Sequence, residues 1–389
     1  MNPRRLVDTT LFYSPTSGGV RRYLNAKHAW LAAQPGWQHT LLVPGRTERI
    51  APGALCSVPG LPVPGSFNYR LPVNPRRWRR LLEALEPDLI EAGDAFHPAW
   101  AARAVARRRA VPCAAFYHSN LPCILARRIG GRAAERSAAA YVRWLYEDFD
   151  VVFAPSRLMM RALAELGIAH TVHQPLGVDE TVFHPDRRGR WLRARLNVEP
   201  QSRLLVYAGR FTDEKNVPVL LQAFARLGRP YHLLMIGGSR AGRLAANVTQ
   251  LPYRGDSVQL AQWLASADAL VHAGSRETFG LIILEAMACG RPVVAVRAGA
   301  VPELLDERIG LLADPNNALS LADAIAALYA YDLDALGRSA RQHVLQHYTW
   351  QRVFQHQLAV YRALLVGGRA AAVQEAVAPA GCISDRATP

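Results

Sequence analysis

The chain has 389 residues, half of them hydrophobic and a fifth charged, which is typical of a globular protein with room for two domains. No run of 18 apolar residues occurs, so the sequence predicts no transmembrane helix, and the N-terminus lacks the apolar core of a signal peptide. The five cysteines form no CxxC pair, which argues against disulfides and structural zinc and favours a cytoplasmic protein.

The formal net charge is +15 at pH 7, so we expect phosphate-bearing partners: a nucleotide, an anionic lipid surface or nucleic acid. Of the 46 basic residues only Lys27 and Lys215 are lysine. In a chain that otherwise uses arginine, Lys215 indicates a place that needs a compact point charge, although chance retention explains it equally well.

The first half alternates apolar runs with helical patterns, which predicts a parallel α/β sheet. A strand over 5–13 leads into a glycine turn and a helical pattern over 20–33. Residues 51–75 are rich in proline and glycine and predict a loop. The other expected strands are 40–43, 88–91, 113–117 and 150–154, and the other expected helices are 76–86, 98–109 and 132–146.

A second strand and helix series begins near residue 203, after a connection over 175–200. We therefore divide the chain into a domain over 1–180, a domain over 181–348, a C-terminal helix over 349–366 that packs back on the first domain, and a disordered tail over 367–389. The expected strands are 203–208, 231–236, 269–273 and 293–296, and the expected helices are 216–227, 257–266, 280–289 and 318–329.

The sharpest motif is Glu277-Thr-Phe-Gly-Leu-Ile-Ile-Leu-Glu285, which follows a strand and enters a helix expected to start near Gly280. Eight residues along a helix span roughly 12 Å, which suits the two hydroxyl-bearing ends of one ligand, such as a sugar and a ribose. Free N–H groups of residues 279–281 favour a phosphate between them. The alternative is an exposed acid before the helix and a solvated acid within it.

Two further segments carry phosphate-binding chemistry. Gly209-Arg210-Phe-Thr-Asp-Glu-Lys215 follows a buried strand, where an arginine and a lysine can both reach a diphosphate; a surface Arg–Glu pair is the alternative. Gly18-Gly19 lies in the first strand–helix turn and lets backbone N–H groups approach a phosphate, or is only a tight turn. No GxxxxGK[ST] loop is present, which argues against a P-loop ATPase.

Together these segments resemble glycosyltransferase family 4, through GGV at 18–20, GRFTDEKN at 209–216 and ETFGLIILEAMACGRPVVA at 277–295. The resemblance covers roughly residues 5–365, and the spacing of the two glutamates matches the family's E-x7-E motif. It implies the α/β GT-B fold, in which two Rossmann-like doubly wound domains face each other across a cleft. The first domain would then lie on the acceptor side and the second would bind a nucleotide sugar.

The resemblance also implies residue roles. Glu277 would hold donor-sugar hydroxyls, Glu285 would bind the ribose, and Arg210 and Lys215 would grip the diphosphate. His118, at the end of a first-domain strand, would face the donor sugar; its alternative is a structural histidine. The catalytic set is thus His118, Glu277, Arg210 and Lys215, and the remaining donor-binding residues are Gly18, Gly19, Gly238, Arg254, Thr278, Phe279, Gly280, Leu281 and Glu285.

The acceptor side is less defined. Arg132, Arg136 and Arg143 fall on one side of the expected helix 132–146, which suits an anionic membrane surface and a lipid-linked acceptor; plain solvation is the alternative. Asp94 and His97 follow a strand end and are tentative acceptor residues, although an ordinary polar turn explains them too. No DxD motif appears, so we expect neither a metal nor a cofactor beside the nucleotide-sugar co-substrate.

We therefore predict a retaining glycosyltransferase that moves a hexosyl group, first of all mannosyl from GDP-mannose, to a glycan or lipid-linked acceptor. It would be cytoplasmic and peripheral on the inner face of the membrane. The alternatives are a basic nucleic-acid-binding protein, which the absence of a basic-aromatic motif disfavours, or a nucleotide-sugar epimerase or glycogen-type synthase on the same fold. We expect no nucleic-acid partner.

Overall fold

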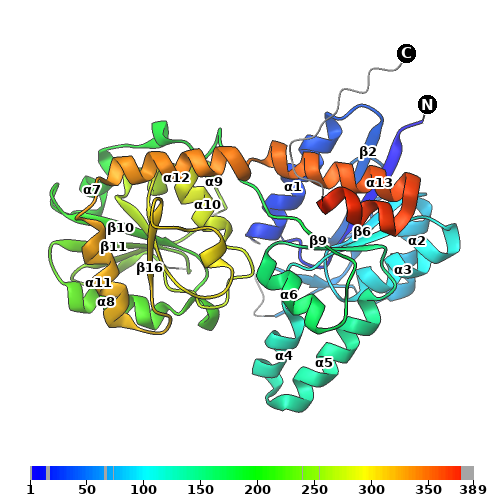
Figure 1. The fold of residues 1–389 in the computed structure, drawn as a ribbon, viewed down its shortest axis with the longest axis horizontal. Helices are drawn as coiled ribbons and strands as arrows, with labels where there is room; N and C mark the ends of the chain where they lie inside the picture. Colours follow the sequence, from blue (N-terminus) through cyan, green and yellow to red (C-terminus); the bar gives the residue numbers. More distant parts are fainter. Residues whose placement is uncertain are drawn as a thin grey trace. The chain divides into compact units, whose positions relative to one another are not determined.

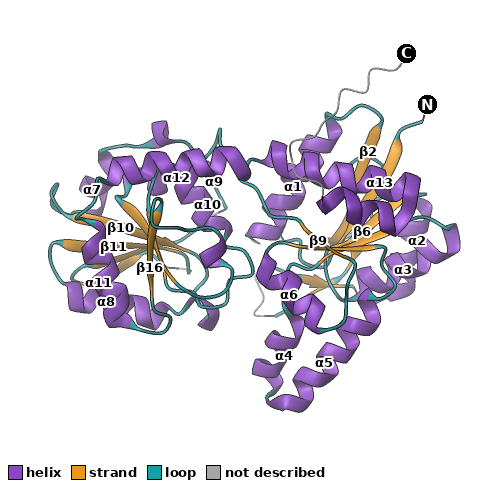
Figure 2. Cartoon of the chain, in the orientation of Figure 1, coloured by secondary structure: helices purple, strands orange, loops and turns teal. Residues whose placement is uncertain are grey.

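The computed structural model describes residues 2–14, 18–64, 68–72, 74–238, 240–253 and 255–377. The chain divides into two compact units, each a β-sheet covered by helices (Figures 1 and 2), which confirms the α/β class. The first unit comprises Met1–Pro155, Met159–Gln174 and Phe354–Pro389, and the second comprises Ser156–Leu158 and Pro175–Val353. The limits near 175 and 353 lie a few residues from the expected divisions at 180 and 348.

The first unit is built on a seven-stranded sheet of order β3-β2-β1-β6-β7-β8-β9, in which every neighbouring pair is parallel. Its order reverses between β1 and β6, as in a doubly wound sheet. The strands are β1 (Arg4–Thr9), β2 (Trp37–Gly45), β3 (Leu55–Pro59), β6 (Leu89–Ala92), β7 (Cys113–Phe116), β8 (Val151–Ala154) and β9 (Thr171–His173). The helices are α1 (Gly19–Ala32), α2 (Pro75–Ala84), α3 (His97–Arg109), α4 (Leu121–Ile129), α5 (Gly131–Tyr146) and α6 (Arg157–Glu165).

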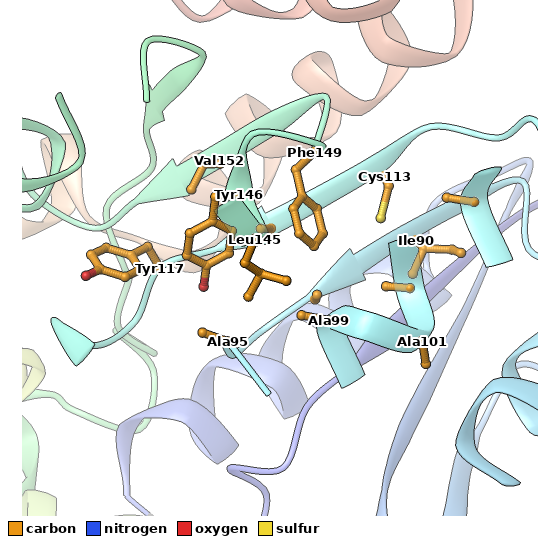
Figure 3. Close-up of a cluster of buried hydrophobic side chains, with 14 of the residues drawn as sticks. Ile90, Ala95, Ala99, Ala101, Cys113, Tyr117, Leu145, Tyr146, Phe149 and Val152 are labelled. Carbon is orange, nitrogen blue, oxygen red and sulfur yellow. The ribbon is translucent and has the colours of Figure 1, made fainter. Parts of the chain in front are cut away.

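Alternate side chains of these strands face opposite sides of the sheet, so a buried parallel sheet needs apolar residues throughout. One side forms a continuous core with helices α2, α3, α5 and α6. Figure 3 shows part of it, where Ile90 and Cys113 of the sheet lie with Ala99, Leu145 and Phe149 from the surrounding helices and turns. The other side carries α1 and the C-terminal helix, through ring contacts such as Tyr23 with Phe116 at 5.1 Å.

The loop expected over 51–75 is partly wrong. Leu55–Pro59 forms β3, an edge strand that alternates buried and half-buried residues, and Leu61–Pro62 (β4) pairs with Arg70–Leu71 (β5) in a short hairpin. The prolines and glycines that predicted a loop are compatible with an edge strand, where a missing backbone N–H leaves no ladder bond unmade.

The second unit repeats the arrangement with a sheet of order β12-β13-β11-β10-β14-β15-β16, parallel except for β12. Helices α8 and α11 cover one face, and α9, α10 and α12 cover the other (Figure 1). The strands are β10 (Arg203–Ala208), β11 (Tyr231–Ile236), β12 (Gly242–Ala245), β13 (Val248–Leu251), β14 (Ala269–His272), β15 (Val293–Val296) and β16 (Gly310–Ala313). The helices are α7 (Trp191–Leu196), α8 (Val217–Leu227), α9 (Ser257–Ser266), α10 (Leu281–Ala288), α11 (Ala318–Leu328) and α12 (Leu333–His347), with one-turn 3₁₀ helices at Pro185–Arg187, Asp213–Lys215 and Val301–Glu303.

The last helix, α13 (Trp350–Val377), covers the helix expected over 349–366 except for its first residue, and continues beyond it. Its backbone leaves helical geometry only at Gly368, with φ 68° and ψ −159°. The prediction of disorder from residue 367 onward is therefore wrong as far as Val377. The small residues of this segment suggested that it packs no core, but its alanines are the strongest helix formers. The rest of the expected tail lies outside the described residues.

A buried charge cluster ties α13 into the first unit. The Lys27 ammonium lies 2.8 Å from Asp8 Oδ2, 2.9 Å from Glu91 Oε1 and 2.6 Å from Tyr361 Oη, and its side chain is 1% exposed. Burial raises the pKa of Asp8, but the charges of Lys27 and His39 outweigh it and lower the pKa to about 2. At Glu91 burial prevails over Lys27, and the pKa is raised. One cation thus holds β1, β6, α1 and α13 together.

Replacing Lys27 tests this interpretation. Lys27→Met should lower the free energy of unfolding by about 3–5 kcal/mol, because it leaves two buried carboxyls without their cation. Adding Glu91→Gln should recover part of the loss, since one buried charge disappears. Urea unfolding measures both, and a Lys27→Met variant within 1 kcal/mol of wild type (roughly the worth of a surface pair) would contradict the interpretation.

Candidate functional site

The strand order of the second unit reverses between the neighbouring parallel strands β10 and β14. From β10 the chain order runs toward one edge of the sheet, through β11, and from β14 it runs toward the other edge, through β15. In such sheets ligands bind outside the carboxyl ends of the strands at the reversal. Residues 209–216 follow β10, and residues 273–281 follow β14. The two strongest sequence motifs therefore meet at the position where the fold favours a ligand.

The Glu277 carboxylate is the centre of this edge. It forms an ion pair with Lys215 Nζ, and its Oε1 lies 2.9 Å from Nε2 of His272, the last residue of β14. Burial raises the pKa of Glu277, but Lys215 and then His272 outweigh it and hold the pKa far below its ordinary value. Glu277 is therefore an ionised, largely buried hydrogen-bond acceptor with a 13% exposed side chain.

Two glycines shape the backbone around Glu277. Gly280 adopts φ 103° at the N-cap of α10, which confirms the expected helix start. Gly299, in the loop after β15, has φ 61°, and a Cβ there would lie 2.7 Å from the backbone N and O of Glu277. The adjacent Ala300 N–H donates to the Glu277 carbonyl at 2.9 Å. Sequence reasoning missed His272 and Gly299, although His272 ends β14 and Gly299 lies in the loop after β15, both at this edge.

The predicted diphosphate cations are already paired with carboxylates. Arg210 is 56% exposed, with its Nη2 3.6 Å from Glu214 Oε1, which is the Arg–Glu pair that the sequence left open. Burial raises the pKa of Glu214, but hydrogen bonds and the charges of Arg210 and Lys215 outweigh it and lower the pKa. Both cations thus act on Glu214, and a bound diphosphate would compete with this carboxylate for them.

The other predicted donor residues that the structure describes in the second unit lie near the same edge. Glu285 is on α10 and only 1% exposed, so the solvated-acid alternative is wrong for it. Thr278, Phe279 and Leu281 flank the start of α10, and Gly238 follows β11. Arg254 lies outside the described residues. Among the described residues, no group of three or more His, Cys, Asp or Glu side chains is placed to hold a metal ion.

In the first unit His118 follows β7. Its ring stacks on Phe116 at 4.0 Å with an interplanar angle of 8°, and Tyr23 contacts it edge-on at 5.4 Å. Burial, and then the charge of Lys27, lowers the pKa of His118 to about 3. His118 is therefore a neutral imidazole near pH 7, able to donate or accept one hydrogen bond but not to act as a cation.

Asp94 has a structural use in its turn. Its Oδ2 accepts hydrogen bonds from Thr10 Oγ1 at 2.9 Å and Leu11 N at 2.5 Å, and its Oδ1 accepts one from Phe96 N at 2.9 Å. This favours the polar-turn alternative for Asp94. His97 begins α3 and its ring contacts Trp100 at 5.2 Å.

The Gly18-Gly19 turn leads directly into the first helix. Gly19 begins α1, and Gly18 is its N-cap without a side-chain hydrogen bond. A Cβ at Gly18 would meet nothing within 4 Å. The space beside Gly18 is therefore open, and the phosphate contact at the start of α1 stays a prediction.

The state of Glu277 can be tested by pH. Because its pKa is lower in the folded chain than the ordinary 4.5, its ionised form stabilises the fold above that pH and loses this effect as pH falls. Glu277→Gln should lower stability by about 2 kcal/mol at pH 7 and flatten the decline below pH 4.5. Thermal unfolding from pH 7 to 3 measures this, with Glu199→Gln, a 58% exposed acid, as control. Parallel curves for wild type and Glu277→Gln would exclude an ionised, paired Glu277.

Comparison with known proteins agrees with this geometry. A glycosyltransferase family 4 model matches residues 17–182, and a glycosyl transferases group 1 model matches residues 202–331. A GDP-mannose-dependent alpha-(1-6)-phosphatidylinositol dimannoside mannosyltransferase of Mycobacterium tuberculosis is 32% identical over 95% of this chain and 99% of its own length. A GDP-mannose-dependent alpha-mannosyltransferase of the same species is 30% identical over 82% of this chain and 84% of its own.

Solved structures show the same fold. Sucrose-phosphate synthase from Thermosynechococcus elongatus matches 93% of this chain and 99% of its own, with a TM-score of 0.77 and 22% identity. The Anabaena protein HepE in complex with UDP-glucose matches 92% of this chain and all of its own, with a TM-score of 0.73 and 19% identity. The chain therefore belongs to glycosyltransferase family 4 and has the GT-B fold. It is a glycosyltransferase, and the predicted class of enzyme is confirmed.

Proposed function

We propose that this glycosyltransferase moves a mannosyl group from GDP-mannose, with retention of configuration, to a glycan or lipid-linked acceptor. Both relatives described above are named as GDP-mannose-dependent mannosyltransferases, and one matches nearly the whole chain. The observation that carries the proposal is the ionised Glu277, held by Lys215 and His272 at the strand reversal. The fixed Glu277 carboxylate suits the sugar hydroxyls of such a ligand, and the cations Lys215 and Arg210 of the turn after β10 suit its diphosphate.

Each residue of this edge then has a chemical task. Departure of the nucleoside diphosphate builds negative charge on the leaving phosphate, which Lys215 and Arg210 stabilise. Glu277 accepts hydrogen bonds from the donor-sugar hydroxyls, and Glu285 binds the ribose. The acceptor hydroxyl passes its proton to the leaving phosphate oxygen on the same face, so no general base is assigned. His118 lies in the first unit, and its predicted part in binding the donor sugar stays a prediction.

We also propose that transfer needs no divalent ion. In metal-dependent transfer the ion neutralises the diphosphate, and here Arg210 and Lys215 supply two positive charges at the same strand end. Lys215 is a compact point charge and Arg210 a planar fork, so together they suit the two phosphate groups of a diphosphate.

A donor panel tests the proposed reaction. Transfer from GDP-mannose, UDP-glucose and ADP-glucose should show a preference for GDP-mannose, with equal rates in EDTA and in Mg²⁺. Glu277→Gln should lower the transfer rate by about 100-fold or more, because it removes a charge that acts in the transition state. Glu199→Gln is the matched control on an exposed acid. Wild-type transfer by Glu277→Gln would refute the site, and a preference for another donor would refute only the choice of GDP-mannose.

For the acceptor, we propose a lipid-linked molecule reached from the inner face of the membrane. Helices α4 and α5 lie side by side as a hairpin (Figure 1), which exposes Arg132, Arg136 and Arg143 together with Ile124 and Trp144. Exposed arginines on a hairpin that also exposes a tryptophan and an isoleucine suit the interface of an anionic bilayer. No described helix is long and apolar enough to span a membrane.

Vesicle binding tests this surface. The chain should co-sediment with vesicles containing phosphatidylglycerol and much less with phosphatidylcholine alone. Arg132→Gln/Arg136→Gln should weaken binding roughly thirtyfold, at about 1 kcal/mol for each of the two charges. Arg226→Gln/Arg229→Gln, two exposed arginines of the second unit, is the control with the same loss of charge. Equal binding by both double variants would show that the hairpin is an ordinary solvated surface.

A further inference from the structure

A cavity of about 400 Å³ lies in the second unit, lined by Arg188, Gly189, Arg190, Arg193 and Ser266. Ser266 ends α9 just before β14, and Arg193 pairs with Asp268, the residue that precedes β14, at 2.6 Å. The cavity therefore lies at the amino ends of the parallel strands. Glu277 and Lys215 follow the carboxyl ends, roughly 13–20 Å away along strands of this length. The cavity is thus separate from the candidate donor site.

The charge of this cavity is unbalanced. Three of its five lining residues are arginines, and none of the five is acidic. Arg193 is neutralised by Asp268 and also donates to the carbonyl of Ser202. The Arg188 side chain is 54% exposed, and its Nη1 lies 3.5 Å from Asp334 Oδ1. It has no other ion pair with a residue that the structure describes. Arg190 is exposed and has no ion pair with any residue that the structure describes. At least one full positive charge faces the cavity without a counter-ion.

A buried arginine, which does not itself line the cavity, shares a carboxylate with Arg188. Arg291, just before β15, has a 5% exposed side chain, and its Nη1 lies 3.7 Å from the same Asp334 oxygen that Arg188 approaches. Two guanidinium groups therefore share one carboxylate, which is itself 61% exposed. The Nε of Arg291 is buried and has no hydrogen-bond partner among the described residues. Burial, and then the charge of Arg188, lowers the pKa of Arg291. A buried, under-paired guanidinium calls for an anion.

We propose that this cavity is a second anion site, which binds a small phosphate-bearing molecule between Arg188 and Arg190. Arg291 adds positive charge next to it, because it shares the Asp334 carboxylate with Arg188. Planar guanidinium groups match phosphate oxygens in paired hydrogen bonds, better than they match a single exposed carboxylate. The volume suits a phosphorylated small molecule rather than a single ion, because small-molecule pockets typically occupy about 300–1,000 Å³. The site does not depend on which nucleotide sugar occupies the opposite edge.

Pyrophosphate is the probe, titrated by calorimetry into the full chain at constant ionic strength set with KCl. The wild type should show two classes of binding event, because the donor edge also accepts phosphates. Arg188→Gln/Arg190→Gln should weaken one class by at least about tenfold and leave the other unchanged. Arg210→Gln should weaken only the other class. Both changed lining arginines are exposed, so neither substitution disturbs the core.

Arg226→Gln/Arg229→Gln is the matched control, since it removes the same charge from exposed positions of the same unit. Retention of both binding classes in this control, with loss of one in Arg188→Gln/Arg190→Gln, supports the site. Identical isotherms for the two double variants overturn it and leave only general attraction to a basic surface. Loss of binding in Arg210→Gln alone would overturn the second site while supporting the proposed donor site.

Discussion

The buried negative charge of Glu277, in the loop after β14, determines which side chains gather at the carboxyl edge of the second unit's sheet. Glu277 is ionised although little of it is exposed, so the fold must bring cations to it. Lys215 comes from the turn after β10 and His272 from the end of β14, and the loop after β15 closes on the Glu277 backbone through Gly299. Three neighbouring strands must therefore end in register. The same requirement pre-orders the edge for a ligand, because its acceptor and its cation are fixed before the ligand arrives.

The two lysines of the chain illustrate one constraint. Both lysines pair with carboxylates. The Lys27 side chain, in the first unit, is 1% exposed, and the Lys215 side chain, in the second unit, is 18% exposed. A compact ammonium with three donors fits among two carboxylates and a phenol, as at Lys27, where a planar guanidinium would need more room. This explains why a chain with 46 basic residues keeps lysine at these positions. Lys215 was singled out from the sequence by its rarity, and Lys27, which is equally rare, lies in the buried cluster.

How much the sequence could predict follows from the range of each interaction. Strands such as 203–208, 231–236 and 293–296, and the helix 257–266, were predicted to the residue, because local periodicity specifies a buried parallel sheet. The meeting of Lys215 with Glu277 could be expected from strand ends alone. The pairing of Arg210 with Glu214 and the use of Asp94 in its turn were left open as alternatives, and the role of His272 was missed, because each depends on side-chain direction. The shared carboxylate of Arg188 and Arg291 joins residues 103 positions apart, and no periodicity reports that.

The pairing of both cations at the donor edge has a consequence for selectivity. A free phosphate must compete with Glu214 for Arg210 and with Glu277 for Lys215, while the nearby carboxylates repel it. On the proposed function, a nucleotide sugar brings its own hydroxyls to Glu277, so it compensates the carboxylate as it takes the ammonium. Neither half of that ligand gains this advantage alone. The edge therefore favours the intact donor over phosphate or sugar, and the rise of charge on the leaving group strengthens its hold when the sugar–phosphate bond breaks.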